Sequence, residues 1–213
     1  QPYKVDEENP YVEAFWDWWK TDLRQSLREL RVTGGEPTMS ADFWKLADLI
    51  KAGEGREDMR FAINSNLGMP DKTWKRLLEF SNSCPVSFDL YTSCESTYKQ
   101  AEYIRHGLDF DLAINRCEEF ITDVPERSSL TFIITMNNLS IVSLKQLLEH
   151  ILYLRKTHTT TYQRIWFDTP LLRTPEWQSM QILPKSYQQC LWDCINFMND
   201  NLDEMHGFKD YEV

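Results

Sequence analysis

The chain has 213 residues, 42% of them hydrophobic, which indicates a folded domain with a sizeable core. Its formal net charge of −10 argues against a nucleic-acid partner, because phosphate binding needs a basic stripe. No apolar run is long enough to span a bilayer, so no membrane partner is expected. Five irregularly spaced cysteines favour a reducing cytoplasm over a disulfide framework.

Helical and strand-like patterns alternate along the chain. A first helix is expected from Asn9-Pro10, a suitable cap and first turn, through the apolar positions up to Leu27. Short apolar strands are expected at residues 30–32, 61–63, 86–90, 130–134 and 164–167. Further helices are expected at residues 41–51, 70–80, 96–121 with Ser96 as the cap and Gly107 as a candidate break, 141–155 and 185–199.

This alternation is typical of βα units and a parallel sheet. Barrels and doubly wound sheets share the pattern, but here every strand ends in polar or turn-forming residues, at residues 33–36, 64–66, 89, 135–137 and 168–169. If these residues meet at one rim, they form the polar mouth at which barrel enzymes place their sites. We therefore predict an α/β fold, an open TIM-type barrel of about five parallel strands with outer helices.

The chain begins on a predicted helix, and the first strand would then be an exposed edge without a neighbour. We therefore expect residues 1–213 to be one domain that is incomplete at both ends, with a preceding strand upstream of Gln1.

The stretch Thr33-Gly34-Gly35-Glu36-Pro37 lies between a strand and a helix. Two glycines allow a sharp bend that leaves backbone groups accessible, and Glu36 adds a carboxylate at the same mouth. These features suit the binding of an ammonium group. In isolation, a plain strand–helix turn is the alternative interpretation.

Three strings carry a resemblance to a known family: residues 9–16 (NPYVEAFW), 30–40 (LRVTGGEPTMS) and 167–177 (FDTPLLRTPEW). Together they resemble radical S-adenosylmethionine (SAM) enzymes, in particular the twitch-domain proteins. The resemblance implies a partial six-unit barrel in which the Gly-Gly-Glu bend holds the amino group of SAM. The implied cofactor-binding residues are Gly34, Gly35, Glu36 and Pro37 at the bend, Ser65 and Asn66 near the methionyl and ribose groups, Asp89 and Asn137 at later strand ends, and Pro170 and Leu171 beside the adenine.

The family also binds a [4Fe–4S] cluster through Cys-x3-Cys-x2-Cys in the loop after the first strand. No cysteine precedes Gly34, so this chain lacks those ligands, and we expect them upstream of Gln1 unless the protein is degenerate. Cys190 and Cys194 share a helix face and could serve an auxiliary cluster. Because no third ligand lies nearby in sequence, buried inert thiols are the preferred interpretation.

The resemblance implies an enzyme that, when intact, reductively cleaves SAM with an electron donor. The resulting 5′-deoxyadenosyl radical would abstract hydrogen from an unknown substrate, for which a peptide or protein is a family-level hypothesis. The alternative is a non-catalytic SAM- or partner-binding barrel domain without a cluster. A barrel that binds a phosphorylated metabolite is less favoured, because no phosphate loop is present and Glu36 would repel phosphate.

Overall fold

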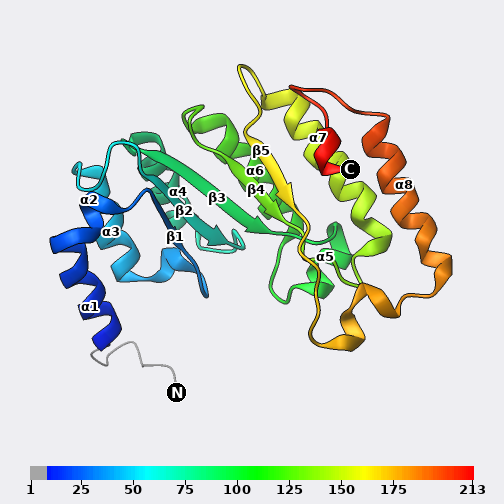
Figure 1. The fold of residues 1–213 in the computed structure, drawn as a ribbon, viewed down its shortest axis with the longest axis horizontal. Coiled ribbons are helices and arrows are strands. Elements are labelled where there is room, and N and C mark those ends of the chain that lie inside the picture. Colours follow the sequence, from blue (N-terminus) through cyan, green and yellow to red (C-terminus); the bar gives the residue numbers. More distant parts are fainter. Residues whose placement is uncertain (1–8) are drawn as a thin grey trace.

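A single five-stranded parallel sheet organises the computed structural model, which describes residues 9–213 (Figure 1). Its spatial order follows the sequence, so that β1 and β5 are the two edges. The strands are β1 Glu29–Val32, β2 Arg60–Ser65, β3 Ser87–Ser93, β4 Leu130–Ile133 and β5 Ile165–Asp168. The predicted α/β class and open TIM-type barrel are confirmed, as is β1 as an edge strand.

The helices that follow the strands form a row behind the sheet (Figure 1). They are α3 Ala41–Lys51, α4 Asp71–Ser83, α6 Phe110–Asp123, α7 Leu144–His158 and α8 Gln188–Asn199, with the short α5 Tyr98–Ile104 before α6. Phe61, Phe88 and Phe132 are fully buried between the sheet and this row. Within residues 9–213, none of the helices has the length and apolar character needed to cross a bilayer.

The first helical segment begins as predicted but is not uniform. Asn9 caps α1 Pro10–Trp18 by accepting a hydrogen bond from the Tyr11 backbone amide at 3.0 Å. A π-helical turn, Trp19–Leu23, then leads into the short α2, Arg24–Ser26. The periodicity did not reveal this turn, because the buried positions Trp16, Trp19 and Leu23 have the spacing of three and four residues that is typical of an α-helix.

Several predicted boundaries were wrong. Strand β3 runs to Ser93, so Asp89 lies inside the strand and not at its end. Strand β2 likewise includes residues 64 and 65. The helical region expected at residues 96–121 is interrupted around Gly107, as predicted, but Thr97, not Ser96, is the cap residue of its first helix. The helices expected at 141 and 185 open with the 3₁₀ turns η3 Ile141–Ser143 and η6 Lys185–Tyr187.

The two faces of the sheet differ in chemistry. Side chains of alternate strand residues point to opposite faces, and the phenylalanines named above face the helices. The other face carries polar side chains, and on it Arg60 pairs with Asp89, with Nη2 and Nε at 2.6 and 2.9 Å from the same carboxylate oxygen. The second Asp89 oxygen accepts hydrogen bonds from the Ser129 backbone amide and hydroxyl.

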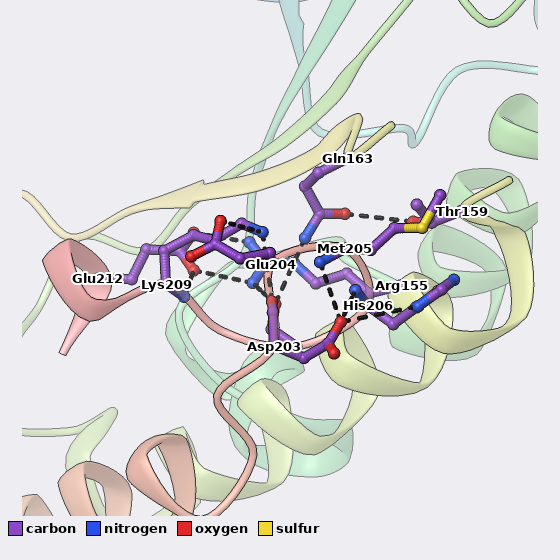
Figure 2. A network of polar contacts seen from close by, with 10 residues as sticks. Arg155, Thr159, Gln163, Asp203, Glu204, Met205, His206, Lys209 and Glu212 are labelled. Carbon is purple, nitrogen blue, oxygen red and sulfur yellow. Dashed lines mark hydrogen bonds and ion pairs between the residues drawn. The ribbon is translucent and has the colours of Figure 1, made fainter. Parts of the chain in front are cut away.

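The C-terminal segment folds back against α7 and the start of β5 (Figure 2). Arg155, which is 0% exposed, donates to both carboxylate oxygens of Glu212 at 2.7 and 2.9 Å. It also donates to the backbone carbonyls of Ile165 and Gly207. This network fixes the end of the described chain at the amino ends of the strands.

Candidate functional site

All strand-to-helix loops that follow the strands lie at one rim, because parallel strands end at the same edge of the sheet. The glycine bend follows β1, the loop with Asn66 follows β2, Asn137 lies after β4, and Pro170 lies after β5. The rim therefore gathers most of the residues predicted for the site.

At the glycine bend, the backbone adopts the left-handed region, with φ of +94° at Gly34 and +47° at Gly35. Side-chain-bearing residues rarely adopt these angles, which explains the glycine pair. A Cβ atom added at either position would meet no atom within 4 Å, so the space beside the bend is open. No described residue of the chain donates a hydrogen bond to the carbonyl of Gly34 or Gly35. Both carbonyls are thus available to a ligand.

The Glu36 carboxylate is held in place beside this bend. One oxygen accepts a hydrogen bond from the Thr38 hydroxyl at 2.7 Å, and the other accepts one from the Ser65 hydroxyl at 2.7 Å. Glu36 also caps the 3₁₀ turn η2 Pro37–Met39. A carboxylate has about four acceptor positions, so an oriented Glu36 can still receive an ammonium group.

The Ser65 side chain makes its contacts within the chain. Its side chain is buried, and its hydroxyl donates to Glu36 while accepting from the Leu67 backbone amide at 3.0 Å. It positions Glu36 and does not face open space. Pro37 is also buried, as the first residue of the 3₁₀ turn. The neighbouring Asn66 is exposed, and its amide oxygen accepts from the Gly68 backbone amide at 2.9 Å.

Arg116 of α6 braces the loop that carries Asn66. Its Nη1 donates to the carbonyls of Leu67 and Met69 at 2.6 and 2.7 Å, and its Nη2 donates to Asp71. The Arg116 side chain is buried, and the hydrogen bonds that it donates all go to this loop and to Asp71 at the start of α4. Sequence reasoning missed Arg116, because 49 residues separate it from Leu67 and no local pattern links them.

Asp89 does not join the rim. Strand β3 continues four residues beyond it, which corresponds to roughly 13 Å along a strand. Its carboxylate is occupied by Arg60 and Ser129. The prediction treated Leu90 as the strand end because the apolar run stops there, but the polar residues that follow remain in the sheet.

A cavity of about 290 Å³ lies at the other side of the rim. Its walls come from three loops and α5, and they comprise Glu95, Ile104, Arg105, Thr135, Asn137, Leu172 and Gln178. The buried Glu95 carboxylate is paired with Arg105, whose Nε donates at 2.6 Å. Sequence reasoning missed both residues, since their pairing depends on how α5 folds back on the loop.

The predicted residues Asn137, Pro170 and Leu171 meet near this cavity. Asn137 accepts from the Leu139 backbone amide at 3.0 Å and shapes the turn after β4. The Pro170 carbonyl accepts from the Met136 amide at 2.7 Å, which joins the two loops. Leu171 is 63% exposed. The structure therefore forms two clusters, one at the glycine bend and one at the cavity.

The cysteines do not form a metal site. Within residues 9–213, no group of three or more His, Cys, Asp or Glu side chains is arranged to hold a metal ion. Burial raises the pKa of Cys94 to about 12 and that of Cys194 to about 11, so both thiols stay protonated near neutral pH. Cluster irons bind thiolates, and the described residues therefore do not fit a [4Fe–4S] cluster.

No family model matches the sequence, and no curated protein matches it significantly. Two solved structures are similar in fold. A domain of pyruvate-formate lyase-activating enzyme from Bacteroides vulgatus ATCC 8482 has a TM-score of 0.50 at 15% identity, covering 79% of this chain and 93% of that one. Streptococcus suis SuiB has a TM-score of 0.59 at 10% identity, covering 92% of this chain and 42% of that one. At these identities the likeness shows a shared fold, and the chain spans less than half of SuiB.

Proposed function

We propose that this chain is the SAM-binding core of a radical SAM enzyme. The observation that carries the proposal is the open glycine bend at the rim of a partial parallel barrel, with Glu36 held beside it by Thr38 and Ser65. The two solved structures with a similar fold are radical SAM proteins, which supports the same assignment.

The two clusters at the rim suit the two ends of SAM. The ammonium would be held by the free carbonyls of Gly34 and Gly35 together with the Glu36 carboxylate, a charge-assisted interaction. The exposed amide of Asn66 would face the methionyl or ribose hydroxyls. The adenine would lie near Asn137 and the backbone at Pro170 and Leu171, beside the 290 Å³ cavity. Asp89 has no part in this arrangement.

When bound, a [4Fe–4S] cluster would supply the electron that cleaves SAM to methionine and the 5′-deoxyadenosyl radical. The proposal places its ligands outside the described residues, and a separate donor would reduce it. The chain's own residues bind and orient SAM and shield it from water. All five cysteines are free, which suits a reducing compartment such as the cytoplasm.

The radical would abstract hydrogen from a substrate, and a peptide or protein is the class suggested by the twitch-domain resemblance. A second function remains, in which the barrel binds SAM or a partner without catalysis. The observation that favours it is that the described residues offer no cluster ligands.

Anaerobic reconstitution of the intact protein with iron and sulfide tests the proposal. We expect iron–sulfur absorbance, SAM binding by calorimetry, and 5′-deoxyadenosine formation after reduction. SAM binding without a cluster would instead establish the non-catalytic module. The absence of SAM binding, cluster and product together would reject both.

A further inference from the structure

Arg31 lies on the polar face of the sheet and is held from two sides. Its Nε donates to the side-chain oxygen of Asn64 on β2 at 2.6 Å. Its guanidinium carbon is 3.5 Å from the centre of the Tyr91 ring on β3, a cation–π contact. The two contacts fix both the plane and the direction of the guanidinium, although the residue is exposed on an edge strand.

The charge of Arg31 has no internal counterpart. Its terminal nitrogens donate to no residue within the described range 9–213, and it forms no ion pair there. Arg60, on the same face, is instead paired with both nitrogens to Asp89. Acidic residues outnumber basic ones, 33 to 23, so carboxylates are abundant in the chain. Arg31 is therefore an oriented cation whose terminal nitrogens have no partner among the described residues, although carboxylates are abundant in the chain.

We propose that Arg31 binds a carboxylate of a ligand on the polar face, with Asn64 and Tyr91 as positioning residues. One face of the Arg31 guanidinium lies on the Tyr91 ring, and its Nε donates to Asn64. The two terminal nitrogens therefore remain available as a planar fork. Such a fork matches the two oxygens of a carboxylate, and its preorganisation lowers the entropy lost on binding. Arg31 lies three residues before Gly34 on the same strand-to-loop segment, so the ligand would extend from the bend into the barrel.

Two sources supply this chemistry: the methionyl carboxylate of SAM and a carboxylate of the substrate. The first source rests on the proposed function, whereas the second needs only a ligand on the polar face. Three measurements distinguish the two sources, and the first of them tests carboxylate binding by Arg31 without SAM or substrate.

The first measurement follows the arginine Nε–H resonances of intact, ¹⁵N-arginine-labelled protein during titration with acetate. Sodium chloride at equal ionic strength is the control for screening. We expect a saturable shift of the Arg31 resonance with acetate only, while the paired Arg60 resonance stays unchanged. Equal responses to acetate and chloride would overturn the proposal, and would show Arg31 to be a surface residue packed on Tyr91. This measurement needs no variant and does not depend on SAM.

Variants then test the positioning residues. Tyr91→Phe keeps the ring and should leave the acetate response unchanged, whereas Tyr91→Leu should weaken it severalfold. Identical responses from Tyr91→Phe and Tyr91→Leu would remove Tyr91 from the site.

Calorimetry with SAM and decarboxylated SAM identifies the source. If the SAM carboxylate binds Arg31, Arg31→Gln should weaken SAM about tenfold and leave decarboxylated SAM unaffected. If the substrate supplies it, Arg31→Gln should not change SAM affinity, and saturating SAM should leave the acetate response intact. Failure of both SAM forms to bind wild type would reject the proposed function, while the acetate result would still decide the Arg31 site.

Discussion

The two ends of the strands differ in how their polar groups are used. At the amino ends, the Arg155 network satisfies its members internally, with a bidentate pair to Glu212 and bonds to two backbone carbonyls (Figure 2). At the carboxyl ends, Gly34 and Gly35 present carbonyls without an internal donor among the described residues. Both ends are polar, but only one has capacity left for a ligand.

Polarity alone therefore does not mark a binding site. Removing either partner of a buried pair such as Arg155 and Glu212 leaves an uncompensated charge, so the pair serves the fold. The exposed bend at Gly34 and Gly35 makes no such internal pair, because glycine adopts its positive φ angles without strain and the two carbonyls accept no hydrogen bond from the described residues. Substitutions at the amino ends should therefore change folding, and substitutions at the rim should change binding.

The largest effect is expected for Arg155→Met. It removes the cationic partner of the Glu212 carboxylate, whose side chain is 5% exposed, and breaking a buried pair costs roughly 3–5 kcal/mol. Urea unfolding measures the loss. Lys156→Met, on the exposed side of the same helix, is the control and should change stability by less than about 0.5 kcal/mol.

SAM affinity of the folded fraction of Arg155→Met should equal that of wild type. A variant as stable as wild type would contradict the role of this network in fixing the C-terminal segment.

Gly35→Val should weaken SAM affinity by at least a hundredfold. Valine at a φ of +47° is strained by roughly 1–3 kcal/mol, and its side chain would enter the open space that the ligand needs. Gly53→Val is the matched control, since Gly53 has a φ of +88° and equally open surroundings at the end of α3.

Both glycine variants should lose similar stability in urea, but only Gly35→Val should lose SAM in calorimetry. Equal SAM affinities in the two variants would show that the bend is only a turn.

The bend and most of the topology could be predicted because both depend on patterns among neighbouring residues. A glycine pair after an apolar run, and strands alternating with helices, can be recognised within short windows. The β3 boundary was wrong for the same reason: Tyr91 and Thr92 carry polar groups but are good strand formers, so the end of the apolar run was not the end of the strand.

Contacts between distant residues could not be predicted in this way. The Arg155 pair spans 57 residues, and the Arg31 contact with Asn64 spans 33. Each is set by strand register or helix packing, which local sequence patterns do not reveal. The corresponding arginines look like ordinary charged residues until the fold places their partners.

Glu36→Gln should weaken SAM about tenfold to hundredfold. The substitution keeps the shape and the hydrogen bonds that glutamine can still accept, but it removes the charge opposite the ammonium, worth roughly 1.5–3 kcal/mol. Calorimetric titration of SAM measures the change. Glu29→Gln, an exposed glutamate on β1, removes the same charge away from the bend and is the control.

An unchanged affinity in Glu36→Gln would take Glu36 out of the site, and with it most of the support for the SAM assignment.

The smallest effect on binding is expected for Ser65→Ala. The serine does not face the ligand but donates to one Glu36 oxygen at 2.7 Å, so its loss frees that oxygen and loosens the carboxylate without removing it. A hydrogen bond to a carboxylate contributes roughly 1.5–3 kcal/mol. Because this bond is not made to SAM itself, we expect only part of it to appear in binding, as about a twofold to tenfold loss in SAM affinity. The control is Ser81→Ala, at a buried serine on α4 that donates to the Leu77 carbonyl, and it should leave SAM affinity unchanged.

If Ser65 acts through Glu36, the Ser65→Ala change should add nothing further in the Glu36→Gln background. A full additional loss in the double variant would mean that Ser65 contacts SAM itself.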